Sequence, residues 1–149
     1  MKQLAVSAIR NGTVIDQIDS KRTFIVSEIL KLHEEEQEVL VGINLSSKKL
    51  KKKGIIKIAG KILTKEEVNK IALIAPDATL NIIKDYEVQK KIKVELTGAI
   101  KEIVKCFNPN CVSNHQIVHH QFEVVCKQPV KLRCHYCERI MTGKDIRLI

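Results

Sequence analysis

Short apolar runs separated by turn residues fill the first 96 positions, and this pattern predicts strands more often than helices. The Asn11-Gly12 dipeptide between the first two runs predicts a tight turn, in which Gly12 supplies a positive φ. The predicted strands cover residues 4–9, 13–18, 38–44 and 55–59, followed by a strand, a turn at Lys84-Asp85 and another strand over 78–88.

Helical periodicity appears in two places. Four apolar residues at helical spacing predict a helix over about residues 22–33, behind an N-cap at Asp19-Ser20: Phe24, Ile25, Ile29 and Leu32. Thr64 to Glu67 match the capping box, in which the threonine accepts from a first-turn amide and the glutamate reaches back. The apolar rhythm of this second helix continues to Ala75, and Pro76 ends it.

The order of these elements, β-β-α-β-β-α-β(β), predicts an α+β fold in which an antiparallel sheet carries two helices on one face. The run at 38–44 is almost continuously apolar. Such a strand is either covered on both sides or lies at a sheet edge that pairs with another chain. The sequence leaves both alternatives open.

The last third of the chain predicts a second, small all-β domain that binds zinc. Residues 96–99 are the best candidate for a hinge, which gives domains at 1–97 and 98–149. A unit of about 50 residues buries little core, so we expect metal ligation to supply most of its stability. Strand-like segments follow the hinge at 100–105, 116–126, 130–133 and 146–149.

Four cysteines in two close pairs predict the metal site. Cys106 and Cys111 form the first pair and Cys134 and Cys137 the second, and the segment between the pairs is long enough for two strands. Two turns that each supply two thiolates form a tetrahedral zinc site, and a zinc ion with four protein ligands is structural rather than catalytic. Pro109 and its flanking asparagines suit a tight knuckle whose backbone amides point at the sulfurs.

Other interpretations of the cysteines are weaker. A disulfide framework needs a secreted context, and the first residues lack a signal-peptide layout, so we expect a reducing cytoplasm. A redox Cys-x-x-Cys belongs between a strand and a helix, not among short strand-like runs. His115 or His135 could replace a cysteine as ligand, since each lies close to one in sequence. The fifth thiol, Cys126, ends a strand pattern, and we expect a small core residue there.

Composition and charge widen the range of partners. The chain is 44% hydrophobic and 29% charged, without an apolar run of membrane-spanning length, so we expect a soluble globular protein. Its formal charge of +9 favours polyanions: nucleic acid, nucleotides or an acidic protein. The lysine run at 48–53 is either a phosphate-binding strip or a solvated loop, and no aromatic residue interrupts it to form a base-stacking platform.

Four motifs in sequence carry a family resemblance: Gly12-Thr13-Val14-Ile15-Asp16, the segment from Ala75 to Asn81, Tyr86-Glu87-Val88, and the two spaced cysteine pairs. From about Leu4 to its end, the chain resembles the regulatory chain of aspartate carbamoyltransferase. The resemblance implies an allosteric domain that binds nucleoside triphosphates and a zinc domain that docks on a separate catalytic chain. It implies no catalysis by this polypeptide.

The resemblance also implies an assembly and a pathway. The family joins two catalytic trimers through three regulatory dimers into a dodecamer of pyrimidine biosynthesis. CTP, UTP and ATP would bias the trimers between two quaternary states. The strand at 39–43 falls where the contact between two regulatory chains is expected.

By position, the resemblance implies an effector site on the first domain. Asp16 would accept from ribose hydroxyls, and Lys57 and Lys91 would neutralise the triphosphate, although taken alone both lysines are ordinary surface charges. Gln17 stands where family members carry a histidine that faces the phosphates. The implied set is Val6, Ala8, Ile9, Val14, Asp16, Gln17, Lys57, Asn81, Ile83, Tyr86, Val88 and Lys91.

On the zinc side, four residues match positions that touch catalytic subunits in the family: Asn108, Asn110, Glu138 and Arg139. They lie on the two cysteine turns, so the metal would position them for docking.

Two functions of other classes compete with this expectation. A basic zinc-ribbon protein that binds RNA or DNA fits the charge, the lysine run and the cysteines, and its affinity would fall steeply with salt. A free-standing enzyme is a poor interpretation, because no Ser/His/Asp or paired-carboxylate constellation emerges and the metal site is closed.

Overall fold

The computed structural model describes residues 8–96 and 99–149. The strand predicted at 4–9 therefore lies outside the described residues except for Ala8 and Ile9, which adopt no regular structure. The chain divides into two compact units, Met1–Val94 and Glu95–Ile149, and each is described by itself. The predicted boundary after residue 97 falls on Thr97 and Gly98, outside the described residues, and it stays a prediction.

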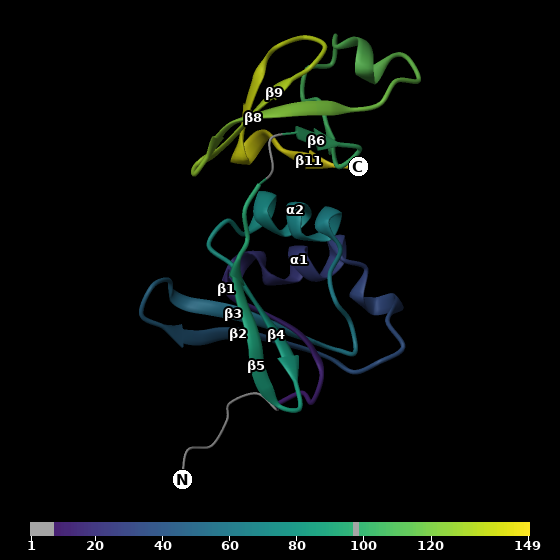
Figure 1. Ribbon diagram of the computed structural model, residues 1–149. Helices are drawn as coiled ribbons and strands as arrows, with labels where there is room; N and C mark the ends of the chain where they lie inside the picture. The colour runs from purple at the N-terminus through teal and green to yellow at the C-terminus, as the bar shows by residue number, and fades with distance from the viewer. Residues whose placement is uncertain (1–7, 97–98) are drawn as a thin grey trace. The chain divides into compact units, whose positions relative to one another are not determined.

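The first unit is built on a five-stranded antiparallel sheet (Figure 1). Its spatial order is β2-β3-β1-β4-β5, so the first described strand lies at the centre. Helices α1 and α2 lie on one side of this sheet, which confirms the predicted α+β layer. The strands are β1 (Gly12–Asp19), β2 (Val39–Ser47), β3 (Lys51–Ala59), β4 (Thr79–Lys84) and β5 (Glu87–Lys93).

The first helix is shorter than predicted. Asp19 caps a 3-10 turn, η1 (Ser20–Arg22), by accepting from the Lys21 amide at 3.0 Å, and α1 (Thr23–Ile29) follows. Lys31 then adopts a left-handed conformation with φ 53°, which ends the helical run before a second 3-10 turn, η2 (Leu32–Glu34).

The buried face of α1 also differs from the predicted one. Phe24 and Ile25 helped to predict the helix, yet they are 59% and 43% exposed. Thr23 and Val26 are fully buried instead. The reason is tertiary: Thr23 packs directly on Gly54 of β3, and this close contact fixes which side of α1 meets the sheet.

The second helix, α2 (Lys65–Ile74), confirms its sequence signals. The Thr64 hydroxyl accepts from the Glu67 amide at 3.2 Å, and the Glu67 carboxylate accepts from the Thr64 amide at 3.0 Å. Burial alone would raise the pKa of Glu67, but the Thr64 amide and the Lys61 ammonium outweigh it, so the pKa is lowered. The helix ends two residues before Pro76.

The alternation of side chains gives the sheet two different faces. Thr13, Ile15 and Ile56 are fully buried on the side that carries the helices, since Ile56 shares a face of β3 with Gly54, which meets α1. The intervening residues of the same strands, Val14 and Lys57 among them, belong to the opposite side. Two predicted turns can be compared with the structure. Gly12 has the expected positive φ of 139°, and the β4–β5 turn falls on Asp85 and Tyr86, one residue later than predicted.

Strand β2 occupies an edge of the sheet, which excludes the alternative of a strand covered on both sides, and its pairing with another chain stays a prediction. Val41 and Ile43 are each 37% exposed along this edge. A long apolar edge strand carries unpaired backbone groups and is a ready pairing surface.

No helix of the described residues has both the length and the apolar character needed to cross a bilayer.

The second unit consists of β-strands joined by turns and short 3-10 turns, which confirms the predicted all-β domain. A four-stranded sheet has the order β10-β9-β8-β6, and β11 pairs with β7. The predicted strand at 100–105 is broken by Glu102, whose φ is 60°, and the one predicted at 116–126 begins only at Gln121. Strand β10 was not predicted. The strands are β6 (Ala99–Lys101), β7 (Val104–Lys105), β8 (Gln121–Lys127), β9 (Val130–Cys134), β10 (Ile140–Thr142) and β11 (Arg147–Leu148), with 3-10 turns η3 (Val112–Asn114) and η4 (Gly143–Asp145).

The packing of α1 on β3 gives a stability prediction. A Cβ added to Gly54 would lie 2.7 Å from the Thr23 Cβ. We expect Gly54→Ala to lower the free energy of unfolding of the first unit by about 1–3 kcal/mol, the usual cost of overpacking, measured by urea unfolding. Gly143→Ala is the control, because a Cβ there meets no atom within 4 Å. Wild-type stability of Gly54→Ala would contradict the close contact.

Candidate functional site

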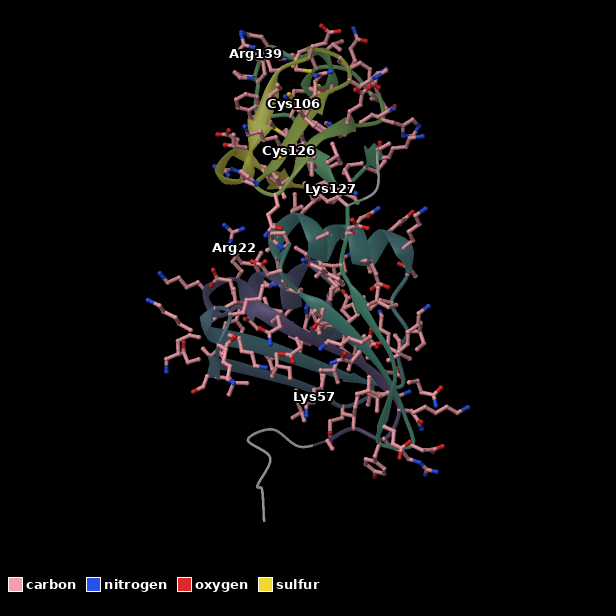
Figure 2. The ribbon with its side chains drawn as sticks, turned by 60° about the vertical axis from the view of Figure 1, so that its left-hand side comes forward. Arg22, Lys57, Cys106, Cys126, Lys127 and Arg139 are labelled. Atoms are coloured by element: carbon pink, nitrogen blue, oxygen red, sulfur yellow. The ribbon has the colours of Figure 1, made fainter. Side chains whose placement is uncertain are left out.

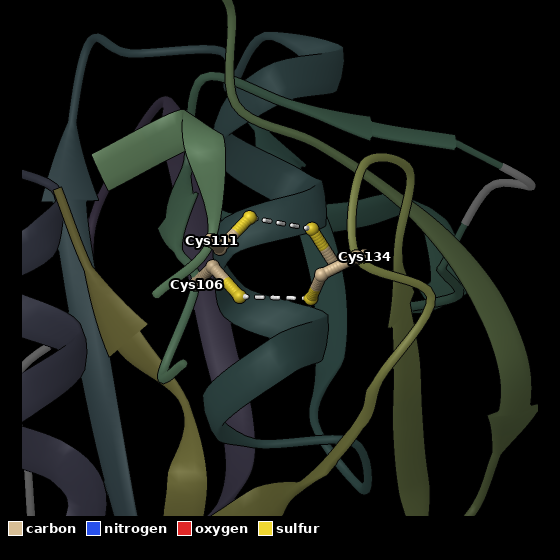
Figure 3. A group of neighbouring side chains, drawn as sticks. Cys106, Cys111 and Cys134 are labelled. Atoms are coloured by element: carbon tan, nitrogen blue, oxygen red, sulfur yellow. Dashed lines mark hydrogen bonds between the residues drawn. The ribbon is translucent and has the colours of Figure 1, made fainter. Parts of the chain in front are cut away.

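The four predicted metal ligands come together in the second unit (Figure 3). The sulfurs of Cys106 and Cys137 are 3.7 Å apart, as are those of Cys111 and Cys134, and all four lie within 4.8 Å of one another. A zinc–sulfur bond of about 2.3 Å gives a tetrahedron with edges of about 3.8 Å. The cluster therefore has the size that one tetrahedral zinc ion requires.

Each cysteine pair is held by a turn that directs amides at the sulfurs. The Asn108 amide donates to Cys106, the Tyr136 and Cys137 amides donate to Cys134, and the Arg139 amide donates to Cys137. This arrangement confirms the predicted knuckles. Such donors stabilise thiolate charge and orient the ligands before a metal arrives.

Burial makes the cluster costly to ionise without a cation. Desolvation raises the pKa of Cys106 and of Cys134. At Cys137 burial acts in the same direction, but the Arg139 amide and the Asn108 side chain outweigh it and lower the pKa to about 7. Four adjacent thiolates repel one another, and a divalent cation supplies the charge that holds them deprotonated.

The alternative ligands lie outside the cluster. The Nε2 atom of His115 is 2.6 Å from the Pro109 carbonyl oxygen, and the exposed His135 packs edge-on against Tyr136. Cys126 is partly exposed on β8 rather than buried in the core, because that strand becomes irregular between Val124 and Cys126. The structure therefore favours the four-cysteine set.

In the first unit, the residues of the predicted effector site line up across the sheet. Val14 of β1 pairs with Lys57 of β3 on one side and with Asn81 of β4 on the other, and Asn81 pairs with Lys91 of β5. Ile83 pairs with Val88 one step further along. Figure 2 shows Lys57 on the side of the sheet away from α2. Register thus brings together residues from four strands on the face without helices.

An ion pair lies beside this row, further along β1 and β3. The Lys53 ammonium lies 2.8 Å from Asp16 Oδ1, with only 19% and 21% of the two side chains exposed. The Gln17 amide donates to the same carboxylate at 2.7 Å. Burial lowers the pKa of Lys57, against the opposing attraction of Asp16. Lys53 was not predicted to lie on this face, because the lysine run at 48–53 contains no signal that separates it from its exposed neighbours.

Two buried oxygens on this face lack a partner in the described part of the chain. Thr79 Oγ1 and Asn81 Oδ1 have no hydrogen-bond partner among the described residues. They lie two residues apart on β4, so they share a face, and Thr79 pairs with Asp16. Unpaired buried oxygens favour a ligand that supplies donors. Thr79 was also missed, although its spacing from Asn81 on a predicted strand could have indicated it.

The remaining predicted effector residues differ in their exposure. Tyr86 and Val88 are 66% and 58% exposed, and Ile9 is buried. Ala8 is exposed, and Gln17 accepts from the Ser47 hydroxyl through Oε1 at 3.1 Å. Val6 lies outside the described residues.

The predicted partner-interface residues separate into two groups. Asn110, Glu138 and Arg139 are exposed on the knuckles, and Figure 2 places Arg139 within the second unit. Asn108 is only 8% exposed and makes its hydrogen bonds within the knuckles.

The fold and the cluster define a class: a two-domain protein that pairs an α+β sheet domain with a closed four-cysteine metal domain. Two family models match in tandem, "Aspartate carbamoyltransferase regulatory chain, allosteric domain" over residues 4–95 and "Aspartate carbamoyltransferase regulatory chain, metal binding domain" over residues 98–147. The chain belongs to the family of aspartate carbamoyltransferase regulatory chains. It is a non-catalytic regulatory subunit with an allosteric and a metal-binding domain, and the enzyme so named acts in pyrimidine biosynthesis.

Relatives support this over nearly the whole chain, and each carries the name aspartate carbamoyltransferase regulatory chain. The chain is 51% identical over 148 residues to the one from Pyrococcus abyssi, covering 98% of this chain and 97% of the relative. It is 55% identical over 141 residues to that of Thermococcus sibiricus, covering 95% and 93%. A bacterial relative from Bacteroides fragilis is 46% identical over 146 residues, covering 98% and 95%. None of these matches favours the nucleic-acid-binding alternative.

The geometry of the cluster gives a direct prediction. Cys111→Ser should abolish stoichiometric metal binding, because Cys111 is buried and its sulfur lies 3.7 Å from that of Cys134. Metal content of the purified chain, measured by plasma mass spectrometry, should fall from one ion per chain to a small fraction. Cys126→Ser is the matched control and should keep the metal. Equal metal loss in both variants would contradict the four-ligand assignment.

Proposed function

We propose that this chain binds nucleoside triphosphates on the helix-free face of its first unit and passes their effect to aspartate carbamoyltransferase catalytic chains. The observation that carries the proposal is the row of Val14, Lys57, Asn81 and Lys91 across four strands, beside two buried oxygens that have no partner within residues 8–96 and 99–149. Family membership supports the same interpretation.

The chemistry of the face suits each part of a nucleotide. Lys57 and Lys91 supply ammonium charges for the triphosphate, with Lys53 close by. Asp16, Asn81 and Thr79 supply acceptors for ribose hydroxyls and for the exocyclic amine of a base. The backbone near Ile9 distinguishes one base edge from another. CTP, UTP and ATP are the effectors we propose.

We propose that the metal is zinc and that its role is structural. Four protein thiolates leave no open coordination position, and the cluster matches the size of a zinc tetrahedron. Asn110, Glu138 and Arg139 would then be presented on metal-braced turns for docking on a catalytic chain.

The proposed assembly is the dodecamer of two catalytic trimers and three regulatory dimers, in the cytoplasm. Strand β2 supports the regulatory dimer, because its apolar edge is open for pairing in the described part of the chain. Effector binding biases the trimers between two quaternary states through a coupling free energy, typically about 1–3 kcal/mol. A nucleotide shifts this equilibrium only if its affinity differs between the two states.

The proposal is tested on holoenzyme reconstituted with catalytic trimers. Titration with CTP and with ATP should shift the aspartate saturation curve, and superimposable curves would refute the regulatory role. Lys91→Ala should weaken nucleotide binding by about 10- to 100-fold, since a hydrogen bond to a charged group contributes about 1.5–3 kcal/mol. Asn81→Ala should weaken it by about 2- to 10-fold, since a neutral hydrogen bond contributes about 0.5–1.5 kcal/mol. Lys52→Ala removes an exposed lysine from the strand that carries Lys57 and should leave nucleotide affinity unchanged.

Nucleotide binding should also depend on pH through Lys57. Because burial lowers the pKa of Lys57, its charge is lost at a lower pH than the usual value of about 10.4. A triphosphate favours the ammonium form, so affinity should fall as pH rises toward that lowered pKa, and binding should take up protons there. Lys57→Arg stays charged and should flatten the profile, measured by calorimetry in buffers of different ionisation enthalpy. An unchanged profile in Lys57→Arg would exclude Lys57 as its source.

A further inference from the structure

The 3-10 turn η3 points its polar side chain inward and its apolar one outward. It begins directly after Cys111, a member of the cysteine cluster. Ser113 is only 5% exposed, whereas its neighbour Val112 is 38% exposed. Serine is mostly found at protein surfaces and valine in cores. Such a reversal of the usual preference indicates that the buried hydroxyl has a specific role.

The Ser113 hydroxyl contacts the cysteine cluster directly. Its Oγ atom lies 3.1 Å from the Sγ atom of Cys111, and both residues are buried. The same sulfur lies 3.7 Å from that of Cys134. A cysteine that binds a metal is a thiolate and carries no proton, so in the metal-bound cluster the hydroxyl is the donor and the sulfur the acceptor. Ser113 therefore directs its O–H group at a ligand atom.

Asn114 fixes the position from which Ser113 reaches the sulfur. Its Nδ2 group donates to the carbonyl oxygen of Cys106 at 3.0 Å and to that of Asn108 at 2.8 Å. Its backbone amide donates to the carbonyl oxygen of Cys111 at 3.0 Å. These bonds attach η3 to the start, the middle and the end of the first knuckle, residues 106–111. The backbone that carries Ser113 is thus fixed relative to the first cysteine pair.

The second knuckle, residues 134–137, is held by backbone bonds. The Cys134 amide donates to the Arg139 carbonyl oxygen, and the Glu138 amide donates to the Cys134 carbonyl oxygen, both at 3.0 Å. The Tyr136 hydroxyl donates to the His119 carbonyl oxygen at 2.7 Å and not to a sulfur. Four thiolates around one divalent cation keep an excess of two negative charges, which hydrogen-bond donors stabilise in a buried site. Ser113 supplies such a donor from the side of the first knuckle.

We propose that Ser113 is a positioning residue whose hydroxyl donates to the Cys111 thiolate, fixes the direction of that ligand and slows the release of the metal. The inference rests on the zinc centre of the proposed function. Ser113 is not itself a ligand, because the four thiolates already fill a tetrahedral site. It acts through Cys111, which it holds in the position that the metal requires.

The test uses the full-length, zinc-loaded chain and measures zinc transfer to a chromophoric chelator in excess. Ser113→Ala removes the hydroxyl and leaves the rest of the side chain in place. Loss of an outer-sphere partner typically costs about 10- to 100-fold in metal affinity. We expect zinc release to accelerate by about 10-fold in Ser113→Ala. Ile117→Ala is the control and should release zinc at the wild-type rate, because it truncates a fully exposed side chain four residues further along.

A second readout separates hydrogen bonding from packing. Loss of the O–H···S bond raises the energy of the sulfur lone pairs in the Co²⁺-substituted chain. The thiolate-to-cobalt absorption band should therefore move to longer wavelength in Ser113→Ala and stay unchanged in Ile117→Ala. The proposal requires both changes in Ser113→Ala. Faster release with an unchanged band would indicate packing alone, and a shifted band with a wild-type rate would exclude control of release, so either result overturns it.

The outcomes distinguish the inference from the function beneath it. A wild-type chain that carries no zinc would refute the zinc centre itself. If the wild-type chain holds zinc and Ser113→Ala matches Ile117→Ala in rate and spectrum, only the positioning role is overturned. If Ser113→Ala is isolated without metal, Ser113→Thr decides, because it restores a hydroxyl: metal retained in Ser113→Thr supports the role, and metal lost overturns it.

Discussion

The closure of two turns on one point is the constraint on which the second unit depends. Its strands are short, and its core consists of a few side chains such as Phe122, Leu132 and Met141. Three buried thiols and the partly exposed Cys137 lie within 4.8 Å of one another, and they cannot all ionise unless a cation joins them. Metal ligation therefore supplies the cohesion that a unit of about 50 residues cannot draw from apolar burial. The surface residues of both knuckles owe their positions to the same bonds.

Register has the corresponding importance in the first unit. Ile15 is fully buried on the side of the helices, and its neighbour Val14 lies on the opposite side, in the row with Lys57 and Asn81. A slip of one residue in β1 would exchange these faces, so it would lose the core and break up the row of polar residues. The same strand therefore couples stability to the proposed nucleotide recognition. Asp16 extends this link to the lysine-rich hairpin through its ion pair with Lys53.

Features that depend on neighbours in sequence were predictable. The capping box at Thr64 and Glu67 and the two cysteine knuckles are formed by residues a few positions apart, so their spacing specifies their geometry. The face of α1 was not predictable in this way. Its orientation follows from the contact between Thr23 and Gly54, which are distant in sequence, and Phe24 is left exposed despite its hydrophobicity.

The sequence by itself determined the α+β pattern, the ligands of the metal and the family, because local periodicity and cysteine spacing carry that information. Tertiary structure alone decided that β2 lies at an edge and that Thr79 and Lys53 join the face where we propose that nucleotides bind. These features arise from strand order, register and burial. Each depends on which distant segments of the chain lie side by side, and spacing along a single segment does not encode that.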